Sequence, residues 1–120
     1  MNSMVITQQK LFGLLELNDE GTVVYSRING GDDVHGFASD IKGLNFYTEV
    51  APFKNIRKFQ QCLDNFRRGS EQAETISFIC EYDDGPVPVR VLMARIRERA
   101  GNDATKSILV HIRKAVMSNE

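Results

Sequence analysis

The chain has 120 residues, of which 42% are hydrophobic and 26% are charged, with a formal net charge of −1. Such a chain is long enough for one globular domain with its own core, and its composition argues against disorder and against a secreted disulfide scaffold. A charge near zero disfavours nucleic-acid binding, and the lack of a signal-peptide pattern or of an apolar run long enough to cross a membrane leads us to expect a cytoplasmic protein.

The N-terminal third of the sequence predicts a short helix followed by a β-hairpin. We expect a short helix over residues 3–10, whose few apolar side chains include Met4 and Val5. A leucine-rich run over 11–17 ends at the turn signal Asn-Asp-Glu-Gly, and β-branched and aromatic residues follow over 22–25. Two such runs around a four-residue loop are typical of a hairpin. The next stretch, 26–44, is rich in glycine, which predicts loops with at most single helical turns.

The clearest predicted helix follows Pro52. Its apolar residues recur at helical spacing and so share one helical face. They are Ile56, Phe59, Leu63 and Phe66. Asn55 stands where an N-cap is expected and Gly69 where a helix often ends in glycine, so the predicted helix runs between these two residues.

The final third of the chain is predicted to be β-structure. Apolar residues alternate with other residues over 74–82, 87–99 and 105–114, and turn signals separate the three segments. Three antiparallel strands after a helix, with a hairpin before it, predict the α+β class. We expect one five-stranded antiparallel sheet with helices packed on one of its faces.

The order of these elements resembles that of a PAS domain, and the likeness is specific in three segments. Residues 12–17 read Phe-Gly-Leu-Leu-Glu-Leu, and residues 43–52 read Gly-Leu-Asn-Phe-Tyr-Thr-Glu-Val-Ala-Pro. Both are similar to the photoactive yellow protein branch of the family, as is Pro-Val-Pro-Val-Arg-Val-Leu-Met over 86–93. The resemblance implies a PAS domain over 11–114, between an N-terminal segment, 1–10, and a short tail, 115–120.

The residues that would hold the chromophore of that branch are replaced. In the family, a cysteine directly after Val-Ala-Pro bonds coumaric acid, whereas this chain has Phe53, which offers no nucleophile. The family's tyrosine and glutamate that hydrogen-bond the chromophore align with Ser26 and Gly30, and a nearby threonine aligns with Val34. We expect a colourless protein in which Phe53 is buried and points into the former pocket. The candidate pocket residues are Ser26, Gly30, Val34, Phe46, Phe53, Val91 and Met93.

The sequence indicates no other cofactor and no catalytic site. Neither Cys62 nor Cys80 has a neighbouring histidine or a Cys-x-x-Cys spacing, and the Asn-Cys-Arg context of a flavin-linked cysteine is missing. The predicted helix lacks the histidine that haem-binding PAS proteins use there. We expect no coumaric acid, haem, flavin or metal, and no enzymatic activity.

Two kinds of function remain open. The chain is either a sensory or regulatory PAS module, which binds a small ligand between sheet and helices or a partner protein, or a ligand-free interaction or dimerisation domain with a filled core. We expect a homodimer formed by the N-terminal segment and the outer face of the sheet, with an effector protein as a further candidate partner. The candidate interface residues are Val5, Leu92, Ile96 and Leu109. A basic stripe, which we interpret as a solvated surface, consists of Arg90, Arg95, Arg97 and Arg99.

Overall fold

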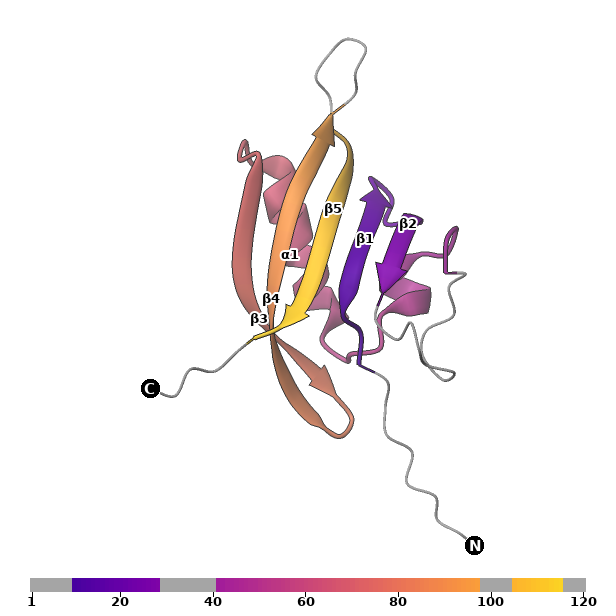
Figure 1. Ribbon diagram of the computed structural model, residues 1–120, viewed down its shortest axis with the longest axis vertical. Coiled ribbons are helices and arrows are strands. Elements are labelled where there is room, and N and C mark those ends of the chain that lie inside the picture. The colour runs from indigo at the N-terminus through magenta and orange to yellow at the C-terminus, as the bar shows by residue number, and fades with distance from the viewer. Residues whose placement is uncertain (1–9, 29–40, 98–104, 116–120) are drawn as a thin grey trace, which may run out of the picture.

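The computed structural model describes residues 10–28, 41–97 and 105–115, which form one open antiparallel sheet with helices on one face (Figure 1). The strands are β1 (Gly13–Asn18), β2 (Val23–Ile28), β3 (Ala73–Tyr82), β4 (Gly85–Arg97) and β5 (Thr105–Lys114). Their order across the sheet is β2-β1-β5-β4-β3, so β2 and β3 are its two edge strands. The predicted five-stranded antiparallel sheet is confirmed.

The hairpin of β1 and β2 confirms the first predicted strands, but β2 is longer than the sequence pattern predicts. Ser26 pairs with Leu15 and Ile28 pairs with Gly13, so residues 26–28 belong to the strand. The prediction of a loop is wrong here because β1 offers backbone partners as far as Gly13, and this pairing outweighs a weak local strand signal. Residues 29–40, and the helix predicted within 1–10 except for Lys10, lie outside the described residues.

The predicted helix is confirmed as α1 (Ile56–Arg68), which buries Phe59, Leu63 and Phe66. It lies across the same face of the sheet as a shorter element, η1 (Phe46–Val50), a single π-helical turn (Figure 1). The backbone of the turn closes where the Ala51 N–H donates to the Phe46 carbonyl over 2.9 Å. The sequence pattern does not predict η1.

A close contact with the β1–β2 turn fixes the position of η1. The ring of Tyr47 lies against Gly21, where an added Cβ would come within 2.6 Å of the ring. Gly21 also has a φ of +88°, a backbone conformation that favours glycine. Its carbonyl accepts a hydrogen bond from the Phe46 N–H over 2.8 Å. Glycine at this turn therefore makes room for the ring and supplies the contact that holds η1.

Asn55 and Gly69 flank α1 as the sequence predicts, and the Gly69 N–H donates to the carbonyls of Asn65 and Phe66. Asn55 stands at the N-cap position, but its side chain does not cap the helix. Its Nδ2 donates to the Ile79 carbonyl over 2.8 Å and its Oδ1 accepts from the Glu81 N–H over 3.0 Å, because β3 lies within reach with backbone groups to satisfy. Gly69 follows the helix in an extended conformation, with a φ of −83°, rather than the left-handed one that makes glycine favourable at a helix end.

The core lies between the inner face of the sheet and the two helical segments. β5 and β4 supply alternate buried residues, as expected for strands covered on one face. These are Val89, Val91, Met93, Ile108, Val110 and Ile112. Within the described ranges, no helix is long and apolar enough to span a membrane.

Candidate functional site

The candidate pocket residues on η1, on the loop before α1 and on β4 lie in one hydrophobic cluster. Phe46, Phe53, Val91 and Met93 are all buried there. Phe53 is only 3% exposed, which confirms the prediction that it is buried. Its ring centroid lies 5.4 Å from that of Phe59 and 5.9 Å from that of Tyr82, and both ring pairs are edge-to-face. Phe53 is therefore a buried ring packed among other rings.

The candidate Ser26 lies apart from this cluster. It is half-buried on β2, whereas Phe53 packs against Tyr82 of β3. Because β2 and β3 are opposite edges of the sheet, the structure does not bring Ser26 and Phe53 together. The remaining two candidates, Gly30 and Val34, lie outside the described residues.

A small hollow between α1 and the strands β3 and β4 is a feature that sequence reasoning missed. It has a volume of about 180 Å³ and is lined by Cys62, Asn65, Phe66, Glu74, Ile76 and Met93. Desolvation, followed by the negative charge of Glu74, raises the pKa of the Cys62 thiol above its ordinary value. The thiol is therefore kept in its protonated, weakly nucleophilic form. The position of Cys62 close to the apolar face of the predicted helix was the sequence signal that could have indicated a thiol facing the sheet.

Arg95 is buried beneath the C-terminal end of α1. Its side chain is 7% exposed, and its guanidinium lies 4.6 Å from the ring centroid of Phe66. Its nitrogen atoms donate to the carbonyl oxygens of Phe66, Arg67, Gly69 and Glu71. The interpretation of Arg95 as part of a solvated stripe is wrong, because alternate residues of β4 face the core and Arg95 is in phase with Met93. A cation at this end also compensates the negative end of the helix dipole.

The predicted interface residues on β4 and β5 lie on the outer face of the sheet, opposite the helices. Leu92 is 40% exposed there, and Ile96 and Leu109 are half-buried. Directly paired residues share a face, so the register places Leu92, His111 and Leu14 in one row. We call Leu14, Leu92, Ile96 and Leu109 the outer patch. Val5, the remaining candidate, lies outside the described residues.

Cationic side chains border the outer patch. Arg27 is exposed and pairs with Leu14, and Arg90 pairs directly with Arg113, so two like charges face each other across β4 and β5. Like charges in directly opposite positions are unfavourable for the sheet itself. In the described part of the chain, neither Arg90 nor Arg113 forms an ion pair.

An ion pair and a buried phenol fix the start of the described chain to the β3–β4 hairpin. Lys10 Nζ donates to both carboxylate oxygens of Asp84, over 2.9 and 2.8 Å, and lies 4.9 Å from the ring centroid of Tyr82. The Tyr82 hydroxyl accepts a hydrogen bond from the Leu11 N–H, and burial raises its pKa to about 12. The Lys10 hydrogen bonds hold the pKa of Asp84 below its usual value.

The sequence matches no family model and no curated protein, but the fold matches solved structures. One is a light-oxygen-voltage domain studied with a flavin analogue, with 17% identity and a TM-score of 0.55, covering 88% of this chain and 78% of that one. Another is the light-oxygen-voltage domain of the blue-light photoreceptor Aureochrome1 in its light state, with 14% identity and a TM-score of 0.54, covering 92% and 84%. Likeness at such identities concerns the fold, and light-oxygen-voltage domains are built on the PAS fold. This chain is therefore an α+β domain with the PAS fold.

Proposed function

We propose that the chain is a regulatory PAS module that acts through protein contacts on the outer face of its sheet. The observation that carries this proposal is the outer patch, in which Leu92 is 40% exposed on the same face as Ile96 and Leu109, with Thr75 and His111 as its cross-strand partners. The outer face of a sheet covered on one side ordinarily carries polar residues, and a contiguous apolar surface is typical of an interaction site.

The packing of the inner face supports protein contact over cofactor binding. Phe53, Phe59 and Phe78 are in mutual ring contact, with centroids 5.2 to 6.3 Å apart, in the layer between α1 and the sheet. This packing supports a filled layer over a bound flavin, for which these rings would have to move apart. The sequence also lacks Asn-Cys-Arg, so it has no counterpart of a flavin-linked cysteine.

The proposed partner is a protein segment that carries both apolar and acidic side chains. Its apolar residues would cover Leu92 and Leu109, and its carboxylates would lie near Arg90 and Arg113. These two arginines repel each other in the free domain, so an acidic partner relieves an existing unfavourable interaction. An effector protein with an acidic amphipathic segment meets these requirements.

A synthetic amphipathic peptide of leucine and glutamate tests this surface. We expect amide resonances of Leu92, Leu109 and His111 to shift on titration, and the shifts to disappear in Leu92→Asp. A leucine–lysine peptide should not bind, and Ser70→Asp, which adds the same charge at an exposed position elsewhere, should behave as the parent protein. Shifts confined to α1 and the inner face, or none at all, would contradict the proposal.

A second candidate function, binding of a small ligand, is favoured by the hollow beside Cys62. Its volume of about 180 Å³ admits only a small molecule, and Phe66, Ile76 and Met93 give it an apolar wall. Native mass spectrometry of freshly purified protein would detect a bound molecule as added mass. Loss of that mass in Met93→Trp, a substitution that fills the hollow, would assign the ligand to this site.

We also propose that the chain is a member of the photoactive yellow protein branch that attaches no coumaric acid. Phe53 stands where that branch has its cysteine, and a phenyl ring cannot form a thioester. Incubation with activated coumaric acid should give neither added mass nor visible absorption. A stable adduct with a new visible band would contradict this proposal.

A further inference from the structure

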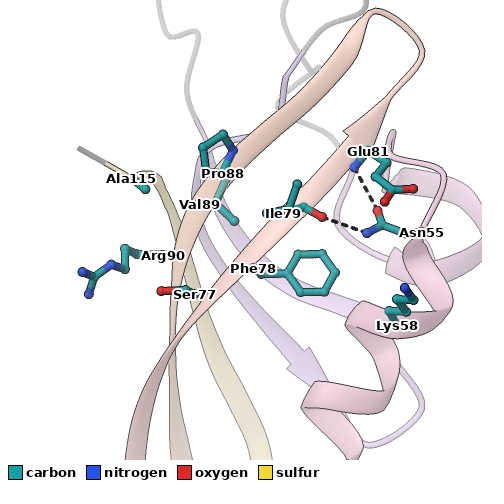
Figure 2. A pocket seen from close by; sticks show the side chains of 10 residues that line it. All are labelled: Asn55, Lys58, Ser77, Phe78, Ile79, Glu81, Pro88, Val89, Arg90 and Ala115. Atoms are coloured by element: carbon teal, nitrogen blue, oxygen red, sulfur yellow. Dashed lines mark hydrogen bonds between the residues drawn. The ribbon is translucent and has the colours of Figure 1, made fainter. Parts of the chain in front are cut away.

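The edge strand β3 offers a second surface for protein contact, separate from the outer patch. Among the described strands, β3 pairs with β4 alone. On its other side, Lys54 and Asn55 bond to the backbone of residues 79–81, and in the described part of the chain the backbone of residues 75–77 is open. A groove of about 670 Å³ lies at this end of the sheet, with Ser77, Phe78 and Ile79 of β3 and Lys58 of α1 in its wall (Figure 2). It extends past β3 to Pro88, Val89 and Arg90 of β4 and to Ala115. The part of the groove beside Ser77 is where an additional strand would lie.

Part of the β3 backbone at this edge is unoccupied. Asn55 already binds the Ile79 carbonyl and the Glu81 N–H, which shows that odd-numbered residues direct their backbone groups to the open side (Figure 2). The hydrogen bond from the Arg95 N–H to the Gln72 carbonyl supports this alternation, because it shows that the carbonyl of an even-numbered residue points toward β4. Residues 75 and 77 therefore present N–H and C=O groups to the groove, and no hydrogen bond to them is formed within the described ranges.

Apolar side chains at the same edge are incompletely covered. Ile79 is 53% exposed on the outer side, and Ile76 and Phe78 are only half-buried on the inner side. An edge strand with open backbone groups and uncovered apolar side chains is a template for another strand.

We propose that two copies of this chain pair antiparallel through their β3 edges, about a two-fold axis at Ser77. In this register Ser77 exchanges both backbone hydrogen bonds with Ser77 of the second copy. Thr75 exchanges its bonds with Ile79 of the second copy, whose carbonyl can accept a second bond beside that from Asn55. Ile76 then lies opposite Phe78 of the second copy, so both half-buried side chains become covered. The contact is self-complementary, as a two-fold interface must be.

The same register brings unlike charges together, which favours a second copy over an unrelated strand. Lys58 lies beside Phe78 and Ile79, and Glu74 faces α1 from further along β3, next to Cys62. The two-fold axis places Glu74 opposite Cys80 of the second copy, two residues along β3 from the Phe78 that lines the groove with Lys58 of that copy. Neither Lys58 nor Glu74 forms an ion pair in the described part of the chain, and both are exposed.

Sedimentation equilibrium over the micromolar range, with proline at the axis, tests the proposal. Ser77→Pro removes an N–H that faces the groove and none that faces β4, and proline is tolerated on such an edge. We expect a dimer for the parent protein and for Ser77→Ala, and a folded monomer for Ser77→Pro, with circular dichroism checking the fold. A parent protein that stays monomeric, or a folded Ser77→Pro variant that still forms the dimer, would overturn the proposal.

A charge exchange identifies the occupant of the edge. Lys58→Glu and Glu74→Lys should each raise the dimer dissociation constant by at least about tenfold, and the double variant should restore it. Leu92→Asp should leave this constant unchanged, because the outer patch is not part of the contact. A dimer lost in Leu92→Asp but retained in Ser77→Pro would overturn the edge contact and support the dimer through the outer face that the sequence predicts.

Discussion

The two faces of the sheet differ in how much of their surface the chain itself covers. On the inner face, Phe53 is 3% exposed and packs among aromatic rings, whereas on the outer face Leu92 is 40% exposed. Both are large apolar residues, so the difference comes from what lies over them and not from residue type. The comparison indicates that the inner face supplies the stability of the domain, while apolar surface of the outer face stays exposed.

Truncation of Phe53 is expected to have the largest effect on this comparison. Phe53→Ala removes a buried ring from contact with Phe59, Phe78 and Tyr82, and should lower the free energy of unfolding by about 3–5 kcal/mol. Urea denaturation followed by circular dichroism measures this. Leu92→Ala is the matched control on the outer face and should change the same quantity by no more than about 0.5–1 kcal/mol. Equal losses in the two variants would break the distinction between the faces.

Replacement of Arg95 tests whether a charged residue can belong to the inner face. Arg95→Met keeps much of the side-chain volume but leaves the last carbonyls of α1 without their cationic donor, which should cost about 2–4 kcal/mol. Arg97→Met, at an exposed position on the same strand, should cost about 0.5 kcal/mol. If Arg95→Met is as stable as the parent protein, the hydrogen bonds of Arg95 make no net contribution to the free energy of unfolding.

The two cysteines sharpen the comparison through their reactivity. Cys80 is fully buried on the inner face, and burial raises its pKa to about 12, while Cys62 is partly exposed at the hollow. A disulfide reagent at pH 8 should therefore modify Cys62 first in the folded protein and reach Cys80 only on unfolding. Cys62→Ser should leave the folded protein almost unreactive. Rapid modification of that variant would show that the inner face opens locally.

The smallest expected effect is a pH dependence of stability that comes from the ion pair between Lys10 and Asp84. Lys10 holds the pKa of Asp84 below its usual value, so this contact stabilises the fold above the ordinary carboxyl pKa and is lost as the pH falls through the folded value. In Lys10→Met, the Asp84 carboxyl carbon resonance should titrate at higher pH than in the parent protein. Lys54→Met, which removes the 3.9 Å ion pair with Asp83, is the control and should leave the Asp84 titration unchanged.

Residue patterns predict β3, β4, β5 and α1 because the periodicity of apolar residues is regular in each of them, whereas the hairpin of β1 and β2 is predicted from its residue types and its turn signal, and the end of β2 is missed. They do not predict the role of Asn55, since its partners Ile79 and Glu81 are remote in sequence and are brought close only by folding. η1 escapes prediction for the same reason, because it depends on a contact between Tyr47 and Gly21. Arg95 is different, because its phase with Met93 on β4 already indicated burial.

The candidate site was only partly predictable. The burial of Phe53 follows from its place after Ala51 and Pro52 in a recognisable segment, and it is confirmed. The separation of Ser26 from Phe53 could not be inferred, since it depends on the strand order that places β2 and β3 at opposite edges. The free edge of β3 likewise emerges only from that order.

The fixation of α1 at both ends has a consequence for hydrogen exchange. Helix termini usually exchange their amide hydrogens through local fraying, at little cost in free energy. Here Arg95, a residue of the sheet, donates hydrogen bonds to the carbonyls at the C-terminal end of α1. Asn55, directly before the first turn of α1, is hydrogen-bonded to β3. The amides of the last turn of α1 should therefore exchange in step with the sheet, so that this end of the helix and the sheet open as one cooperative unit.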